Sequence, residues 1–591
     1  MTITLKQAGQ EDRLIQAENG VTLFKALTDA DLRLDAPCGG KGKCGKCVVT
    51  ATGELSVPNS QEIKFAEGNA SRRLACQALV LGDVELRLEG EGAFKSMKSL
   101  GEHEPYDFDP PLKEIDLEIL DRQDPTGCLD IRDITTDSIR ALNEIALVDS
   151  TYSRGRAVVW EGELLESWPI DKDNDRRTGP LAAAFDLGTT GLALAVIDLS
   201  ENRIIAIDTA LNPQVVMGGD VISRITETYD SHDNLLRLQS LGLEGLAGMV
   251  TSAVGNVLGR DISAAVVSGN STMQHLLAAV NPKNLAQAPY RPVFTHMLDI
   301  SHLAPRLNIS PNAKVLMAPM ISSYVGGDIV AGILAVQLQK RKGTVVFIDI
   351  GTNGEIVISR DGKLVATSCA AGPALEGMNI LCGTRAVTGA IDSFVMEEGY
   401  NYKYTTIGDA PAMGICGSAL IDICAFLVKH KVINKGGRMK NPADKELLGE
   451  GGRFWLTDKV FLDQLDVRQV QLAKGAIAAA MEMLMERLGL TLANIDEIVI
   501  AGSFGYHLRA DSLRYISLIP PDYEGPVTFV GNSSLAGSAR LLCNRDSIRQ
   551  VNDIIKEVEV IELGFDPKFQ EEFVKHLAFP DVSKVKPQDS V

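Results

Sequence analysis

One short pattern occurs twice in this chain of 591 residues, and each copy opens a long segment of similar design. The first copy is an apolar run, Leu181–Leu187, followed by a Gly-Thr-Thr turn, and the second is Thr344–Ile350 with a Gly-Thr-Asn-Gly turn. Apolar runs separated by tight polar turns predict antiparallel strands. We expect strands at Leu181–Leu187, Leu192–Leu199 and Arg203–Ala210, and again at Thr344–Ile350, Glu355–Ser359 and Lys363–Ser368. This repeat indicates two similar α/β lobes, each opening on a three-stranded meander.

The two predicted turns carry the residue types that bind phosphate. They read Asp186-Leu-Gly188-Thr189-Thr190 and Asp349-Ile-Gly351-Thr352-Asn353-Gly354-Glu355. Glycines let backbone N–H groups approach phosphate oxygens, and threonine hydroxyls add donors. A carboxylate at each turn suits hydrated Mg²⁺, which prefers carboxylates, waters and phosphates. A single such turn is explained equally well by a plain hairpin, whereas two of them in matching lobes predict a nucleotide-binding cleft.

Further turns downstream fit the same cleft. The apolar strand expected at Ile495–Ala501 ends in Gly502-Ser503-Phe504-Gly505, which suits a turn passing under an adenine ring. Two other glycine-containing turns, at 326–328 and 414–418, precede apolar helical runs. Either one is explained as a cleft turn or as an ordinary helix N-terminus, and the sequence leaves both readings open.

Four cysteines near the N-terminus predict an iron–sulfur cluster. Cys38, Cys44 and Cys47 are separated by five and two residues, and Cys76 follows after twenty-eight more, in RRLACQ. Four thiolates are the usual ligands of a [2Fe–2S] cluster, and ferredoxins use closely related spacings. The intervening glycines suit a loop that points several N–H groups at sulfur. The lysines around the loop are explained either as a docking surface for an acidic redox partner or as ordinary solvated side chains.

A zinc site and two nucleotide-binding motifs fit this loop less well. Zinc sites usually show two paired C-x2-C knuckles, and only one pair is present. Residues 40–45 also match G-x-G-x-x-G, and residues 40–46 match the start of a P-loop. The P-loop needs Ser or Thr where Cys47 stands, and the dinucleotide fingerprint needs a strand before it and a helix after it. The six cysteines outside the proposed ligand set lack ligand spacing and are expected to be buried small residues.

The remaining patterns divide the chain. We expect a ferredoxin-like domain at 1–94, a linker at 95–114, a small α+β middle domain at 115–170, a linker at 171–180 and an ATPase domain at 181–591. In the middle domain, Ile115–Leu120 reads as a strand, Thr136–Leu147 as a helix, and Ala157–Trp160 with Glu163–Trp168 as a hairpin.

Charge and hydropathy narrow the class of protein. The formal net charge of −19 makes nucleic acid an unlikely partner, because phosphate backbones repel an acidic surface. The first residues show no apolar run after a basic start, and no run of eighteen apolar residues occurs. We therefore expect no signal peptide and no membrane span. Sparse cysteines with metal-ligand spacing indicate a reducing compartment, so we expect the cytoplasm.

Two resemblances follow from these motifs. Residues 1–90 resemble a β-grasp ferredoxin domain, in which GELSVPNSQE and RRLACQALVLGDVELRL follow the cluster loop in the usual order. The two lobes resemble the actin/hexokinase/Hsp70-type ATPase fold, which clasps ATP between its lobes. That resemblance implies that the residues of both turns face phosphates and Mg²⁺, and that Gly502, Ser503 and Phe504 line the adenosine pocket. It implies catalytic roles for Asp186, Asp349 and Glu355, without saying which of them positions the attacking water.

The combination resembles the reductive activators of corrinoid-dependent proteins along essentially the whole chain. The strings YVGGDIVAGILA, AAGPALEGMNI and IAGSFGYHL support it. The resemblance implies ATP-dependent reduction of an inactive Co(II) corrinoid protein of a methyl-transfer system to Co(I), with electrons passing through the [2Fe–2S] cluster. It implies ATP and Mg²⁺ as further cofactors and an unidentified low-potential electron donor, and it admits a homodimer.

Three alternatives remain open. An activator of a 2-hydroxyacyl-CoA dehydratase is also an actin-type ATPase that donates electrons, but it carries a [4Fe–4S] cluster shared between subunits. A small-molecule kinase fused to a ferredoxin module would need a base in the cleft, and no residue stands out for that role. A plain electron carrier would leave some four hundred residues unexplained.

Overall fold

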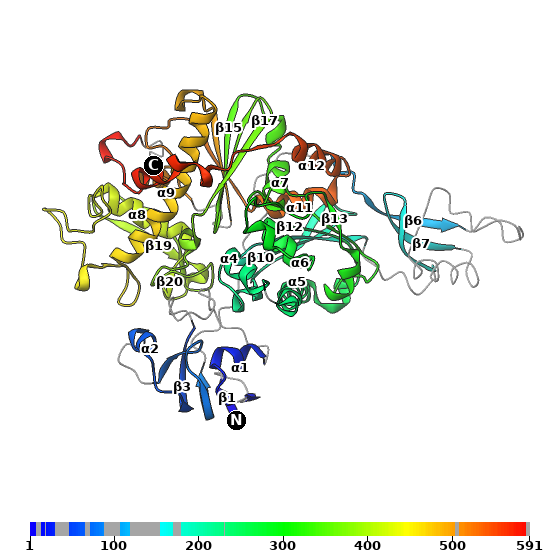
Figure 1. Cartoon of the computed structure of the whole chain (residues 1–591), viewed down its shortest axis with the longest axis horizontal. Helices are drawn as coiled ribbons and strands as arrows, with labels where there is room; N and C mark the ends of the chain where they lie inside the picture. The colour runs from blue at the N-terminus through cyan, green and yellow to red at the C-terminus, as the bar shows by residue number, and fades with distance from the viewer. Residues whose placement is uncertain are drawn as a thin grey trace, which may run out of the picture.

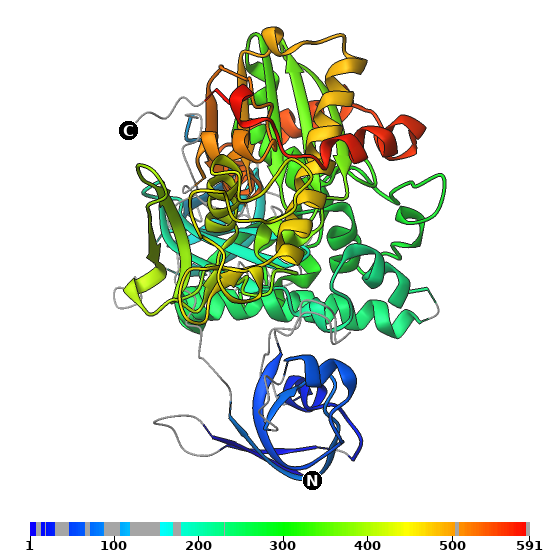
Figure 2. The same cartoon turned by 90° about the vertical axis from the view of Figure 1, so that its left-hand side faces the viewer.

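The computed structural model describes residues 1–6, 13–17, 19–29, 47–65, 71–87, 107–118, 154–169, 179–229, 231–502 and 508–586. Within them the chain forms a five-stranded N-terminal sheet, a separate three-stranded sheet and two six-stranded sheets, with two smaller sheets in the second lobe (Figures 1 and 2). The multidomain α/β and α+β fold class is therefore confirmed. The helix expected at Thr136–Leu147 lies outside the described residues.

The N-terminal sheet has the strand order β2-β1-β5-β3-β4. Its elements are β1 Thr2–Lys6, β2 Arg13–Gln16, α1 Leu23–Asp29, β3 Val48–Leu55, α2 Ser60–Phe65, β4 Arg72–Leu74 and β5 Val80–Arg87. Side chains alternate across a strand, so Ile3 and Leu5 of β1 and Val84 and Leu86 of β5 all enter one core. Pairing of β1 with β5 is parallel, whereas β3 runs antiparallel to β5. This unit lies below the rest of the chain in both views (Figures 1 and 2).

A three-stranded antiparallel sheet comes next, made of β6 Leu112–Glu118, β7 Arg154–Trp160 and β8 Glu163–Pro169. The hairpin expected at 157–168 is present, and β6 begins at Leu112, three residues before the strand expected from the sequence. Its inner side chains join the core of the first lobe. Glu166 accepts a hydrogen bond of 2.6 Å from the Ser263 hydroxyl of that lobe.

The first lobe contains a sheet of order β11-β10-β9-β12-β14-β13. Its elements are β9 Leu181–Leu187, β10 Gly191–Asp198, β11 Arg203–Leu211, α4 Val221–Glu227, α5 His232–Gly259, β12 Ile262–Gly269, α6 Ser271–Leu277, β13 Leu298–Asp299 and β14 Lys314–Met317. The expected meander is present with nearly the expected bounds. Every residue of β12 is buried, as a strand covered on both faces requires.

The second lobe repeats this plan with the order β24-β23-β15-β16-β17-β25. The strands of this sheet are β15 Thr344–Ile350, β16 Gly354–Arg360, β17 Lys363–Cys369, β23 Glu497–Ala501, β24 Val527–Gly531 and β25 Glu559–Val560. One smaller sheet consists of β18 Ala390–Met396, β19 Tyr402–Thr406 and β20 Gly414–Ile415. The other consists of β21 Phe454–Trp455 and β22 Phe461–Leu462. The helices of this lobe are α8 Gly417–Lys429, α9 Gln464–Arg487, α10 Ala510–Tyr515, α12 Asp546–Glu557 and α13 Pro567–His576. In each lobe the first strand runs antiparallel to the second and parallel to the next one inward. The predicted repeat is therefore real at the level of topology.

Two helices join the lobes, α7 Gly327–Ala335 and α11 Ser533–Cys543. Both lie between the two large sheets in Figure 1, and one core cluster contains side chains from both sheets and both helices. The helices cross at very short range, since a Cβ on Gly537 would lie 2.0 Å from the Ala331 carbonyl oxygen. Only a glycine fits there. The N-termini of α7 and α11 both lie beside the hairpin turns described below.

The segment before β6 is anchored at the far end of α11. Asp109 forms a bridge with Asn544, in which the Asp109 amide donates to the Cys543 carbonyl at 3.0 Å and the Arg545 amide donates to the Asp109 carbonyl at 2.9 Å. The Arg545 guanidinium also pairs with the Asp109 carboxylate at 2.7 Å. This part of the expected linker is therefore docked on the ATPase-like region.

Candidate functional site

Strand pairing brings two of the four predicted cluster ligands together. Cys47 directly precedes β3 and Cys76 follows β4, and Val48 pairs with Leu74 across the two strands. The Ala75 amide donates to the Cys47 carbonyl at 2.9 Å, which closes the end of the ladder. Cys47 is 1% exposed and Cys76 is 6% exposed. Two sheltered thiols at the open end of one hairpin fit a cluster that takes its fourth ligand from a distant part of the sequence. Cys38 and Cys44 lie outside the described residues.

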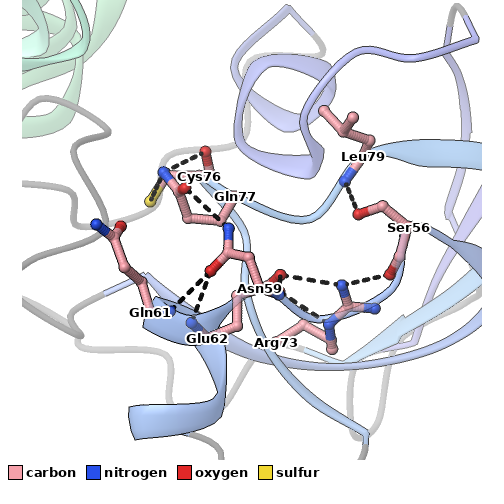
Figure 3. Close-up of polar contacts among 8 residues, drawn as sticks. All are labelled: Ser56, Asn59, Gln61, Glu62, Arg73, Cys76, Gln77 and Leu79. Carbon is pink, nitrogen blue, oxygen red and sulfur yellow. Dashed lines mark hydrogen bonds and ion pairs between the residues drawn. The ribbon is translucent and has the colours of Figure 1, made fainter.

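A polar network supports the backbone beside Cys76 (Figure 3). Glu62 and Arg73, both nearly inaccessible to solvent, form an ion pair of 2.9 Å. Arg73 also donates to the Ser56 carbonyl at 2.7 Å, while Asn59 begins α2 by accepting the Glu62 amide at 3.0 Å. Each buried charge is thus paired and hydrogen-bonded, as burial demands. The loop that precedes α2 and the strand that leads to Cys76 are held together by this network.

The first hairpin turn is braced by side chains of its own lobe. Arg224 is fully buried and donates to the Thr189 carbonyl at 2.6 Å; burial lowers its pKa to about 9. Asn212 donates to the Gly188 carbonyl at 2.8 Å, and Asn270 donates to the Thr189 hydroxyl at 2.8 Å. A Cβ on Gly188 would lie 2.6 Å from the Gly191 carbonyl oxygen, so only glycine fits this turn. With its carbonyl oxygens occupied, the turn is arranged to offer N–H groups to an anion.

The carboxylate of this turn is held by the N-terminus of α11. Asp186 is the penultimate residue of β9 and accepts hydrogen bonds of 2.8 Å from both the Asn532 side-chain amide and the Ser534 hydroxyl. Asn532 also caps α11, because its side-chain oxygen accepts the Leu535 amide at 2.8 Å. Burial raises the pKa of Asp186, and the two hydrogen bonds oppose that rise. The first carboxylate is therefore fixed in position before any ligand arrives.

The second turn faces the first. The hydroxyl oxygens of Thr190 and Thr352 lie 3.3 Å apart across the two lobes, although the residues are far apart in the sequence. Thr352 also donates to Glu376 at 3.2 Å. Asp349 pairs with Glu355 across the hairpin in the same way that Asp186 opposes Ala193 in the first lobe. The structure therefore brings the two predicted phosphate-binding turns into contact.

Five carboxyl groups converge around the two turns. They are Asp186, Asp328, Asp349, Glu355 and Glu376. Burial is the main cause of the raised pKa of each, and neighbouring carboxylates raise the pKa of Asp328, Asp349 and Glu355 further. The pKa of Asp349 is raised to about 8, and those of Asp328 and Glu376 to about 7. Such a concentration of negative charge suits a bound cation, which favours the ionised forms.

The other predicted cleft residues are placed in part. Gly502 follows β23 with φ of 135°, a conformation that favours glycine, and its amide donates to the Gly531 carbonyl at 3.0 Å. Ser503 and Phe504 lie outside the described residues. Just beyond them, Arg509 forms an ion pair of 2.7 Å with Asp422, a fully buried residue of α8.

The two turns that the sequence left open are both helix N-termini, because Gly417 begins α8 and Gly327 begins α7. The turn at α7 also supplies Asp328 to the cluster of carboxyl groups.

Sequence reasoning missed several side chains of this site. Glu376, Asn270, Asn532 and Ser534 were not singled out. No spacing rule could find Asn532 or Ser534, because each lies roughly 350 residues from the carboxylate that it holds. Four of the cysteines expected to be buried are buried, namely Cys369, Cys416, Cys424 and Cys543, whereas Cys382 is only partly buried and Cys128 lies outside the described residues.

Three family descriptions match consecutive parts of the chain. Residues 6–81 match the 2Fe-2S iron-sulfur cluster binding domain, residues 181–341 match the RACo middle region, and residues 343–589 match the C-terminal domain of RACo, the ASKHA domain. Among the described residues, no helix is both long enough and apolar enough to cross a bilayer.

Individual proteins match along most of their length. The corrinoid activation enzyme RamQ of Eubacterium limosum is 29% identical over 96% of this chain and 98% of its own. A reductase of Methanosarcina barkeri, described as acting on the Co(II) methylated amine-specific corrinoid protein, is 24% identical over 64% of this chain and 72% of its own. A solved structure of a reductive activator for a corrinoid, iron–sulfur protein is 28% identical, with a TM-score of 0.75 over 98% of both chains.

Proposed function

The chain belongs to the RACo family, and we propose that it is an ATP-dependent reductive activator that returns an inactive Co(II) corrinoid protein to Co(I). One observation carries this proposal. The same chain holds two buried cysteines at the end of a ferredoxin-like hairpin and two facing Asp-x-Gly-Thr turns in an ATPase-like pair of lobes. An enzyme that only transfers electrons has no use for the second feature, and a kinase has no use for the first.

We propose that Cys38, Cys44, Cys47 and Cys76 hold the [2Fe–2S] cluster. When bound, such a cluster supplies a one-electron carrier of low potential. The protein contributes a sheltered pair of thiols and a rigid hairpin that keeps them in register. In our assignment the N-terminal unit, residues 1–94, carries the electron, and the region from 181 onward carries the nucleotide.

For the nucleotide, we propose that both turns bind phosphate and that the carboxyl groups between them hold Mg²⁺. Asp349 is our first choice of Mg²⁺ ligand, because other carboxyl groups surround it. Phosphate would be bound from the first lobe by Gly188, Thr189 and Thr190, and from the second lobe by Gly351, Thr352, Asn353 and Gly354. The adenosine would lie against Gly502, Ser503 and Phe504. The residue that positions the attacking water stays open among Asp186, Asp349 and Glu355.

The two sites need each other for an energetic reason. Every ~59 mV by which the cobalt couple lies below the electron donor costs a factor of ten in the equilibrium. The two lobes can offset that cost if they close preferentially on one form of the corrinoid protein. That form is the one in which cobalt is easier to reduce. Turning a 1:99 equilibrium into 99:1 takes about 5.5 kcal/mol of differential binding. We propose that ATP binding and hydrolysis supply this preference, and that the protein acts in the cytoplasm.

A reconstitution experiment tests the proposal. Corrinoid protein, a low-potential reductant and this enzyme are mixed, and Co(I) is followed by its absorbance. The wild type is expected to produce Co(I) only with Mg-ATP. Cys44→Ser is expected to hydrolyse ATP yet yield little Co(I), whereas Asp349→Asn should accept an electron at the cluster yet stall at Co(II). Full Co(I) formation without nucleotide, under a reductant no stronger than the cluster, would refute the coupling.

Nucleotide binding has a test of its own. A ligand present at a hundred times its dissociation constant adds about 2.7 kcal/mol to the free energy of unfolding. Mg-ATP is therefore expected to raise the unfolding temperature of the wild type, and a chain that gains no stability at millimolar Mg-ATP would contradict the assignment.

A further inference from the structure

The side chain of Gln77 lies against the sulfur of the predicted fourth cluster ligand (Figure 3). Its amide nitrogen is 3.7 Å from the Cys76 Sγ and 3.2 Å from the Cys76 carbonyl oxygen. The Cys76 thiol here stands in for the thiolate that would bind iron. We propose that Gln77 donates a hydrogen bond to this sulfur and thereby sets the reduction potential of the cluster, an inference that rests on the proposed cluster ligation.

The direction of the Gln77 amide is fixed by a second amide. Asn59 donates from Nδ2 to the Gln77 Oε1 at 3.2 Å. Because the Gln77 oxygen is occupied as an acceptor, the end of the amide that faces Cys76 is the NH₂ group, which can only donate. A flipped amide would place an oxygen against the electron-rich sulfur and would lose the bond to Asn59. The contact with Cys76 is therefore a donor contact.

Asn59 is itself held in one orientation. Its side-chain oxygen accepts the Gln61 amide at 2.9 Å and the Glu62 amide at 3.0 Å, and its backbone amide donates to the Glu62 carboxylate at 3.1 Å. Glu62 is 1% exposed and is paired with Arg73. A series of hydrogen bonds thus connects the buried ion pair of Glu62 and Arg73, through Asn59, to the Gln77 amide that donates to Cys76. A donor preorganised in this way keeps its geometry when the charge on the sulfur changes.

The physical effect has a definite sign. Reduction adds an electron to the cluster and increases the negative charge on its sulfurs. A donor to a ligating sulfur stabilises the reduced form more than the oxidised form, so it raises the reduction potential. Removing the donor must lower the potential. A Gln77 side chain that donated only to the Cys76 carbonyl would not stabilise the charge on the sulfur in this way.

The test uses the full chain with its cluster assembled. We compare the wild type with Gln77→Leu, which keeps the approximate size of the side chain and removes the donor. Gln16→Leu serves as the matched control, because Gln16 lies on β2, at the opposite edge of the same sheet from β4. Iron content and the visible spectrum are measured first, and the midpoint potential follows from a redox titration monitored by electron paramagnetic resonance.

Gln77→Leu is expected to hold two irons and to lower the midpoint potential, so that its reduced-to-oxidised ratio at a fixed poise falls by up to about tenfold, or ~59 mV. Gln16→Leu should match the wild type. Asn59→Ala, which frees the Gln77 amide without touching Cys76, should shift the potential in the same direction by a smaller amount. An unchanged midpoint in Gln77→Leu would overturn the inference.

If Gln77→Leu does not retain iron, the same titration of Asn59→Ala decides the question, and an unchanged midpoint there overturns the inference. Failure of the proposed function looks different. A wild-type chain with no [2Fe–2S] spectrum, or with four irons per cluster, would remove the cluster assignment itself rather than the role of Gln77.

Discussion

The two hairpin turns share a sequence pattern and a topology, but their carboxylates lie in opposite surroundings. Asp186 accepts two hydrogen bonds from the start of α11, and its turn is braced by Arg224, a fully buried residue. The side-chain carboxyl group of Asp349 accepts no hydrogen bond within the part of the chain that the structure describes, and three carboxylates raise its pKa beyond the effect of burial. The first turn is complete without a ligand, whereas the second holds a carboxyl group whose ionisation is opposed by burial and by its carboxylate neighbours.

This difference assigns different tasks to the two lobes. A preformed turn costs little reorganisation when phosphate binds, so the first lobe is suited to recognition of the nucleotide. A group of like charges is stable only when protonated or bound to a cation, so the second lobe is suited to hold Mg²⁺ and to respond to its arrival. If the assignment is right, mutations in the two turns will differ in kind as well as in size.

The largest expected effect belongs to Asp349→Asn. We expect Mg²⁺-dependent ATP hydrolysis to fall about 100-fold, equal to roughly 2.7 kcal/mol, because the proposed ligand of the cation is lost. The unfolding temperature of the nucleotide-free chain should hold or rise, since a like charge has been removed, and the cluster spectrum should not change. Steady-state hydrolysis and thermal unfolding measure both.

Asp361→Asn is the matched control for Asp349→Asn, because Asp361 is an exposed residue at the opposite end of the β16 hairpin, where asparagine also tolerates its positive φ. Equal losses of hydrolysis in the two variants would contradict a specific role for Asp349.

Arg224→Met should act mainly on stability. The substitution keeps the hydrocarbon part of the side chain but leaves the buried carbonyls of Thr189 and Gly218 without their donor, at a cost of about 2 kcal/mol. The affinity for Mg-ATP should weaken as the first turn loosens. Arg203→Met is the control, because Arg203 is 61% exposed and its ion pairs contribute little. Chemical unfolding with and without Mg-ATP separates the two effects, and a fully stable Arg224→Met chain would refute the bracing role.

The dependence of stability on pH should report on the second lobe. Asp349 has a pKa of about 8 in the folded chain and an ordinary value of 3.8, so between these values the folded state binds the extra proton. The contribution of Asp349 to the free energy of unfolding of the nucleotide-free protein then falls as pH rises from about 4 to about 8, by at most about 1.4 kcal/mol per pH unit. Mg²⁺ should reduce this slope. Urea unfolding at several pH values checks the sign, and stability that rises with pH regardless of Mg²⁺ would contradict the charge assignment.

The smallest effect is expected at α11. Ser534→Ala removes a hydrogen bond to the Asp186 carboxylate and one shared with the Ser268 hydroxyl, and it should cost about 1 kcal/mol. The neighbouring Ser533 is buried, and its hydroxyl has no hydrogen-bond partner among the described residues. Ser533→Ala should therefore be neutral or slightly stabilising. Thermal unfolding of this pair compares two serines in consecutive positions, and equal losses would show that the contact with Asp186 is of no special value.

The sequence predicted the strands and the two turns well, because local patterns determine them. The meanders at 181–211 and 344–369 follow from apolar runs of strand length, and Asp186 and Asp349 stand out through the Asp-x-Gly-Thr pattern. Asp328 was harder, since Gly-Gly-Asp before an apolar run also describes any helix start. The partners of Asp186 could not be found at all, because they meet it only through the packing of α11 between the sheets. Local chemistry is visible in a sequence, whereas contacts between lobes depend on the fold.

Helix α11 touches both the proposed nucleotide site, at Asp186, and the anchored segment that precedes the middle sheet. Asn532 and Ser534 at its start hold Asp186, and eleven residues later, about 16 Å along the axis, its last carbonyl accepts the Asp109 amide. Thermodynamic reciprocity applies to any two ligands of one body. If bound nucleotide strengthens or weakens the docking of Asp109, then docked Asp109 must strengthen or weaken nucleotide binding by the same free energy. If the nucleotide changes how firmly Asp109 is docked, a chain truncated before Leu112 must bind ATP with an affinity changed by the same factor, even though no residue of either turn has changed.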